Sequence, residues 1–188
     1  MAEIVLFHHA QGLTDGVRSF GEDLRRAGHT VHVPDLYEGR TFDDLEEGVG
    51  HARTIGFDTI NERGKAAATE LPRGLVYIGI SLGAMSAQDL AQNRPGAKGA
   101  VILHSAMPPE EFGSPWPRGL PLQIHTMEND DWGDPEIARK LGQEVPEAEV
   151  FLYPGDAHLS TDRSLPVYDE ESTKLILQRV LAFLDRVD

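Results

Sequence analysis

The stretch Leu75-Val76-Tyr77-Ile78-Gly79-Ile80-Ser81-Leu82-Gly83 decides how the rest of the sequence is interpreted. Its first four residues are apolar and predict a buried strand, and a helix is expected over residues 85–93. Between them, residues 79–83 match G-x-S-x-G, a sharp strand-to-helix turn that projects the serine hydroxyl. The alternative is an ordinary turn in which Ser81 only caps the helix. Because the motif has the strand and helix that it requires, we interpret Ser81 as a catalytic nucleophile.

Short apolar segments alternate with amphipathic segments along the whole chain. Strands are expected at residues 4–7, 30–33, 75–78, 100–103, 120–124 and 150–152, and helices around residues 17–27, 85–93, 134–143 and 171–186. A long, mostly helical stretch from Phe42 to Glu70 is expected to break near Gly56 and Gly64, and Gly28 fits a helix C-terminus. This order predicts an α/β fold with a doubly wound parallel sheet, in a single domain over residues 1–188.

The composition excludes several classes of partner and chemistry. There are 31 acidic and 17 basic side chains, so the net charge of −14 disfavours nucleic acid and anionic lipid as partners. The absence of cysteine excludes disulfides and a thiol nucleophile. Without a basic leader or an apolar run that could span a bilayer, we expect a cytoplasmic protein with no membrane segment. The oligomeric state is left open between monomer and homodimer.

An activated serine needs a base and an acid, and in this kind of fold the acid comes before the histidine in the chain. His158 is the candidate base, in a turn-rich loop after the last predicted strand, although a loop histidine with no role is the alternative. The acid is expected after the preceding strand, where the candidates are Glu128, Asn129, Asp130 and Asp131. Spacing alone does not choose among them. The same acidic loop is alternatively a divalent-cation site or simply a solvated surface.

Acyl transfer also needs two N–H donors that stabilise the oxyanion. The amide of Leu82, directly after the nucleophile, is the first donor. The second is expected within the segment His8-His9-Ala10-Gln11-Gly12, where we favour the amide of Ala10. The His8-His9 pair is alternatively a set of metal ligands, but adjacent strand residues point to opposite faces and no third ligand is evident, so we expect no metal site.

Five segments together make the sequence resemble the dienelactone hydrolase family over nearly its whole length. They are the strand leading to His8–Leu13, Pro34-Asp35-Leu36-Tyr37, Gly79–Gly83, His125–Asp130, and Tyr153-Pro154-Gly155 with His158. The resemblance implies a three-layer α/β-hydrolase fold with a mostly parallel central sheet, no cap domain and no cofactor. It also favours Asp130 over Asp131 as the acid that orients the histidine.

The sequence departs from this family at two positions of the expected site. Family members often use a cysteine nucleophile gated by a glutamate, whereas here Ser81 replaces the thiol and His9 stands in the glutamate's place. We therefore expect plain serine–histidine general-base catalysis instead of the gated scheme.

The resulting prediction is a serine hydrolase that cleaves small carboxylic esters or lactones through an acyl-enzyme. Ser81 attacks, His158 removes its proton, Asp130 orients the ring, and the amides of Ala10 and Leu82 hold the oxyanion. The expected pocket walls are His9, His104 and Trp116, with a hydrogen-bonded structural role as the alternative for His104. The alternatives are a non-catalytic binding protein on the same fold and a thioesterase or acyltransferase with the same triad. The sequence leaves the choice among lactone, ester and thioester open.

Overall fold

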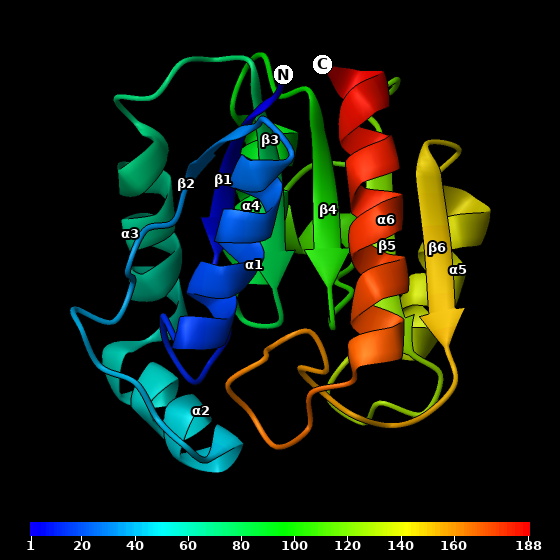
Figure 1. The fold of residues 1–188 in the computed structure, drawn as a ribbon. Coiled ribbons are helices and arrows are strands. Elements are labelled where there is room, and N and C mark those ends of the chain that lie inside the picture. The colour runs from blue at the N-terminus through cyan, green and yellow to red at the C-terminus, as the bar shows by residue number, and fades with distance from the viewer.

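A computed structural model describes residues 1–188 as a six-stranded sheet with helices on both sides (Figure 1). The strands are β1 (Glu3–Phe7), β2 (Thr30–His32), β3 (Leu75–Ile80), β4 (Gly99–Leu103), β5 (Leu122–Met127) and β6 (Ala148–Tyr153). The helices are α1 (Asp15–Arg26), α2 (Leu45–Ile55), α3 (Phe57–Ala68), α4 (Gly83–Asn93), α5 (Pro135–Glu144) and α6 (Glu170–Val187), with a 3₁₀ turn over Pro109–Phe112. The strand order is β2-β1-β3-β4-β5-β6, and every neighbouring pair is parallel.

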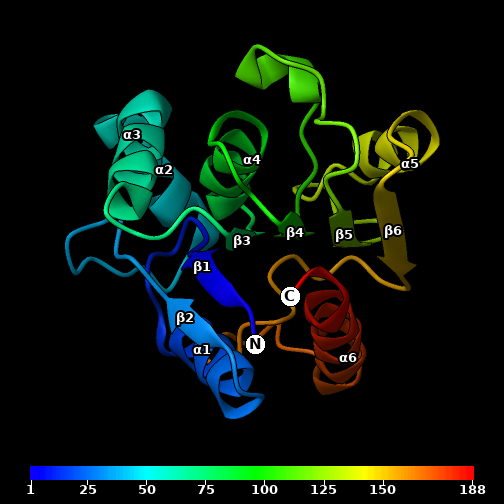
Figure 2. The ribbon, with the colours of Figure 1, turned by 90° about the horizontal axis from the view of Figure 1, so that it is seen from above.

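The sheet separates two hydrophobic cores. Figure 2 shows α1 and α6 on one face of the sheet and α2, α3, α4 and α5 on the other. Side chains of β1 alternate accordingly: Val5 and Phe7 belong to one buried cluster, and Ile4 and Leu6 belong to the other. Strands buried on both faces are typical of parallel sheets covered by helices. The predicted three-layer α/β-hydrolase fold is therefore confirmed, and no separate cap domain is evident.

The strands all end at the same edge of the sheet, at the bottom of Figure 1. The chain leaves β1 in one direction to reach β2 and then returns to place β3 on the other side of β1. Such a switch in winding direction opens a crevice at the carboxyl ends of the strands, where ligands bind in open α/β sheets. The segments after β1, β3, β5 and β6 meet at this edge.

The glycines of the helical region show one confirmed prediction and one wrong one. Gly56 separates α2 from α3 with φ of 93°, as expected from its position. The predicted break near Gly64 is wrong, because α3 runs through it without interruption. A Cβ at Gly64 would lie 2.6 Å from Cβ of Ser86 on α4, so this glycine lets two helices approach closely instead of ending one.

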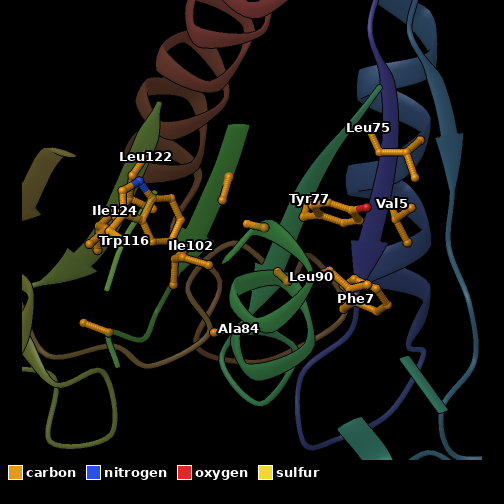
Figure 3. Close-up of a cluster of buried hydrophobic side chains, with 14 of the residues drawn as sticks. Val5, Phe7, Leu75, Tyr77, Ala84, Leu90, Ile102, Trp116, Leu122 and Ile124 are labelled. Atoms are coloured by element: carbon orange, nitrogen blue, oxygen red, sulfur yellow. The ribbon is translucent and has the colours of Figure 1, made fainter. Parts of the chain in front are cut away.

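Trp116 lies in the core instead of in a pocket wall, so that prediction is wrong. Figure 3 shows its ring beside Ile102, Leu122 and Ile124, with which it shares a buried cluster. Its indole Nε1–H donates to the carbonyl of Leu120 at 2.7 Å. The loop after β4 folds back over the sheet, and burying this large ring there stabilises the loop through apolar contact and one satisfied hydrogen bond.

No helix combines the length and apolar character needed to cross a bilayer.

Candidate active site

The turn between β3 and α4 holds Ser81 in a strained conformation. Ser81 has φ of 49°, in the left-handed region that residues with a side chain rarely adopt. Its N–H donates to the carbonyl of Leu103 at 2.8 Å, and its own carbonyl accepts from the N–H of Ala84 at 2.8 Å. A Cβ at Gly83 would lie 2.7 Å from the carbonyl oxygen of His8, so only glycine fits there. The turn thus presents the hydroxyl at the sheet edge, as the motif requires.

Ser81, His158 and Asp130 form one continuous hydrogen-bonded chain. The hydroxyl of Ser81 lies 2.9 Å from Nε2 of His158. Nδ1 of the same ring lies 2.8 Å from Oδ2 of Asp130, and since an ionised carboxylate only accepts, the ring donates there. Asp130 is only 1% exposed, whereas Asp131 points to solvent. The structure therefore brings together the three residues that the sequence singled out and places Asp131 away from them.

The approach of Asp130 to His158 follows from the pairing of β5 with β6. Hydrogen bonding between the two strands continues into the loops beyond them, where the N–H of Asn129 donates to the carbonyl of Gly155 at 3.0 Å. Oδ1 of Asp130 accepts from the N–H of Trp132 at 3.0 Å, which fixes the carboxylate and leaves Oδ2 for the histidine. Parallel neighbouring strands thus carry the acid and the base to the same place.

Two unpaired amides lie beside Ser81. The N–H groups of Ala10 and Leu82 donate to no acceptor in the protein. Both residues, together with Ser81, line a pocket of about 490 Å³. Buried backbone donors are almost always paired, so two free ones at a pocket wall are available to a ligand oxygen.

His8 is a buried structural histidine. Its Nε2 accepts from the N–H of Leu36 at 3.0 Å, so Nδ1 carries the proton and donates to the carbonyl of His9 at 2.8 Å. Burial, opposed by the hydrogen bond to His9, lowers the pKa of His8 to about 4. His8 is therefore neutral at pH 7, and it joins the end of β1 to the loop after β2.

His9 is fully buried and is not part of a pocket wall, so that prediction is also wrong. Its Nδ1 accepts from the N–H of Gln11 at 3.2 Å, and its Nε2–H donates to Oδ2 of Asp162 at 2.7 Å. Both nitrogens of His8 and both of His9 are thus engaged within the protein. No group of three or more histidine, aspartate or glutamate side chains has a metal-binding arrangement.

Asp162 is the centre of a buried network that no sequence pattern indicates. Its carboxylate accepts hydrogen bonds from His9, from the hydroxyl of Thr14, and from the N–H and hydroxyl of Ser164. Burial alone would raise the pKa of Asp162, but the hydrogen bonds from these three residues lower it to about 2. Because His9 immediately precedes Ala10, this network holds the loop with the free amide against the loop that follows His158.

His104 lies behind His158 instead of in a pocket wall. It is fully buried, and its ring packs edge-on against the ring of His158 with centroids 5.9 Å apart. Its Nε2 lies 3.1 Å from the hydroxyl of Thr161, and Nδ1 has no partner. Burial, followed by the neighbouring histidines, lowers the pKa of His104 well below its usual value. The prediction of a wall position is wrong, and the alternative of a structural histidine fits.

Apart from Ser81, Ala10 and Leu82, the walls of the pocket come from residues that the sequence did not single out. Apolar side chains of α2, α3, α4 and two loops line it, namely Val49, Ala52, Phe57, Met85, Met107 and Trp132. Only Trp132 carried a signal, as an aromatic residue directly after the acidic loop. The side chains on the helices are ordinary members of amphipathic patterns, which do not tell a pocket wall from a core contact.

The fold and the site together define an α/β hydrolase. The family model described as the dienelactone hydrolase family matches residues 1–187. The chain therefore belongs to the dienelactone hydrolase family, and this membership indicates a hydrolase. No curated protein sequence matches it significantly.

Solved structures support the fold at low sequence identity. A dienelactone hydrolase-like promiscuous phosphotriesterase from metagenomic libraries is similar with a TM-score of 0.79 and 17% identity, covering 100% of this chain and 87% of that one. For a dienelactone hydrolase from Anabaena variabilis the TM-score is 0.68 at 18% identity, with 99% and 87% covered. Mouse alpha/beta hydrolase domain-containing protein 10 is similar with a TM-score of 0.70 and 14% identity, covering 100% of this chain and 90% of that one.

Proposed function

We propose that this protein hydrolyses carboxylic esters or lactones through an acyl-enzyme on Ser81. The observation that carries the proposal is the unbroken chain from the Ser81 hydroxyl through His158 to Asp130, which opens into a pocket with two free amides. A nucleophile, a base and an oriented acid within hydrogen-bonding distance are the geometry of covalent acyl transfer.

The proposed reaction has two halves. His158 takes the Ser81 proton as Oγ attacks the carbonyl carbon, and the amides of Ala10 and Leu82 stabilise the negative charge on the carbonyl oxygen. The protonated ring then gives its proton to the departing alkoxide, leaving an acyl-serine and free alcohol. Water attacks the acyl-serine with its proton passing to His158, and the acid leaves as Ser81 recovers its proton. Asp130 holds the ring in the required tautomer throughout.

Hydrolysis of p-nitrophenyl butyrate by the wild type and by two matched serine variants tests this function. Ser81→Ala is expected to lower kcat by about 10⁴-fold or more. Ser86→Ala is the control, because Ser86 follows Ser81 closely in the chain, lies on α4, is buried and has no hydrogen-bond partner for its hydroxyl. Its activity should match the wild type. Folded wild type that hydrolyses no ester, lactone or thioester would instead favour a binding protein on this fold.

A further inference from the structure

The protein has a second pocket beside the catalytic residues. The first pocket is lined by Ser81 and by the two residues with free amides, Ala10 and Leu82. The second also measures about 490 Å³, and it is lined by His158. Trp132 lines both pockets, and its ring centroid lies 6.4 Å from that of His158. Ser81 lines one cavity, its hydrogen-bond partner His158 lines the other, and Trp132 borders both.

The chemistry of acyl transfer assigns a role to each pocket. The acyl carbon becomes bonded to Ser81 Oγ, and its oxygen faces the free amides, so the acyl group lies on the side of the first pocket. The departing oxygen must receive a proton from Nε2 of His158, so the alcohol lies on the histidine side. Since the second pocket is the one that His158 lines, it is placed to receive the alcohol.

Resting on the proposed function, we propose that Trp132 divides the site into an acyl pocket and an alcohol pocket, and that the substrates are open-chain esters with apolar groups on both sides. The acyl pocket is the first cavity, and the alcohol pocket is the second. A small lactone carries its acyl and alcohol portions in one ring, so it fills neither pocket. Open-chain esters, which extend in both directions from the carbonyl, use both.

The apolar character of both pockets supports this substrate class. Met85 and Met107 line the acyl pocket, and Leu45 and Leu165 line the alcohol pocket. Cavities of this size with mostly apolar walls and a few polar groups at the reacting centre are typical of small-molecule sites. Burial of apolar substrate in each pocket would contribute binding energy in proportion to the area removed from water.

Exposed apolar side chains at the pocket mouths are a second, independent observation. Among the large hydrophobic side chains that remain exposed are Phe57 at 43%, Trp132 at 46% and Val167 at 44%. Phe57 lines the acyl pocket, Val167 lines the alcohol pocket, and Trp132 lines both. Apolar surface gathered at a binding site is typical of surface that a ligand covers.

The charged side chains around the alcohol pocket limit which leaving alcohols it can bind. Asp43, Asp44 and Asp156 line it, and none of them forms an ion pair with a basic side chain. Like-charge repulsion disfavours an alcohol that carries a carboxylate or phosphate. The alcohol portion is therefore not negatively charged.

Two constitutional isomers test the division, because methyl octanoate is long on the acyl side and heptyl acetate is long on the alcohol side. Met107→Trp fills the acyl pocket and is expected to lower kcat/KM for methyl octanoate by about tenfold, with less than threefold loss for heptyl acetate. Val167→Trp fills the alcohol pocket and should give the reverse pattern. Phe57→Ala, at the exposed rim of the acyl pocket, replaces Met107→Trp if that variant does not fold, and it should also penalise methyl octanoate selectively. Trp132→Ala should bring the ratio of the two isomers' kcat/KM values closer to one than in the wild type. Trp132→Phe should keep the wild-type ratio.

The outcomes separate this inference from the proposed function. A crossed pattern with Met107→Trp penalising heptyl acetate would overturn the pocket assignment, and equal losses or no losses for both isomers would overturn the division. Faster turnover of γ-butyrolactone than of either isomer would overturn the open-chain class. In each of these cases Ser81-dependent hydrolysis of p-nitrophenyl butyrate would still stand. Failure of the proposed function shows instead as folded wild type without any such hydrolysis.

Discussion

The molecule contains two buried histidine–aspartate pairs of nearly the same length but with different surroundings. His158 and Asp130 are 2.8 Å apart, and His9 and Asp162 are 2.7 Å apart. The free nitrogen of the first pair meets the hydroxyl of Ser81 at a pocket, whereas that of the second meets the backbone N–H of Gln11 inside the protein. A histidine–aspartate pair is therefore not a site in itself. The contact of the second ring nitrogen decides whether the pair has a catalytic or a structural role.

The two pairs also involve a common loop. His158 and Asp162 belong to one loop after β6, and His9 belongs to the loop after β1 that carries the free amide of Ala10. The second pair thus fixes the relative position of the two loops that hold the base and an oxyanion donor. Preorganised donors contribute to catalysis because they need no rearrangement as charge develops.

The largest expected effect comes from breaking the first pair. Asp130→Asn should lower kcat for p-nitrophenyl butyrate by about 10⁴-fold with little change in KM, because the amide stabilises the wrong tautomer of His158. Steady-state kinetics measure this. Asp131→Asn is the matched control, since Asp131 is the exposed neighbour, and its kcat should stay within about twofold of the wild type. A severe loss in the control with none in Asp130→Asn would reverse the assignment.

Breaking the second pair should affect stability more than chemistry. Asp162→Asn replaces a carboxylate that accepts from three side chains and is expected to reduce the free energy of unfolding by about 4 kcal/mol. Urea unfolding followed by circular dichroism measures the change. Asp156→Asn, an exposed carboxylate in the same loop, should change it by less than about 0.5 kcal/mol. Equal stability of the Asp162 variant and the wild type would show that the network contributes nothing.

The pH dependence of stability should report the neutral buried histidine beside the second pair. The pKa of His8 is about 4 in the folded protein, so between pH 6.5 and 4 the unfolded state binds a proton that the folded state does not. The free energy of unfolding therefore decreases as the pH is lowered through this window, by about 3 kcal/mol from His8. His8→Gln should remove that part of the slope, and the remainder includes His125, whose pKa burial lowers to about 3. An unchanged slope in the variant would contradict this account.

The smallest expected effect comes from a substitution that removes only one of the two hydrogen bonds of His9. His9→Gln keeps an N–H that donates to Asp162 but loses the acceptor for the amide of Gln11. We expect a loss of about 1 kcal/mol in unfolding free energy and a severalfold lower kcat, since the loop with Ala10 becomes less fixed. His9→Ala should lose more of both. If His9→Gln abolished activity as completely as Ser81→Ala, His9 would have a direct role in catalysis and not a structural one.

The sequence predicted the parts of the site that depend on local pattern. The turn around Ser81 was recognisable because strand, glycine spacing and helix are contiguous, and the loop position of His158 follows from chain order. The family resemblance favours Asp130, and the pairing of β5 with β6 explains why Asp130 and not Asp131 contacts the ring. The strands and helices were expected close to their observed positions for the same local reason, except that β5 begins at Leu122 and runs to Met127.

The parts that the sequence did not predict depend on contacts between distant segments. His9 and Asp162 are 153 positions apart, and nothing in either local pattern marks them as partners. Gly64 in α3 suggests a helix break when only the sequence is considered. Its close contact with Ser86 on α4 depends on the packing of the two helices, which the sequence does not show. The sequence does not distinguish a core position from a pocket position for Trp116, because a loop aromatic packs equally well in either and only its tertiary contacts decide.

The most direct test of the central claim is labelling of native protein with a fluorophosphonate, followed by peptide mass spectrometry. The account predicts that the label is found on Ser81 alone, and that it is lost in Ser81→Ala and strongly reduced in His158→Ala, where the serine remains but its base is gone. Folded wild type that stays unlabelled, or that carries the label on another residue, would contradict it.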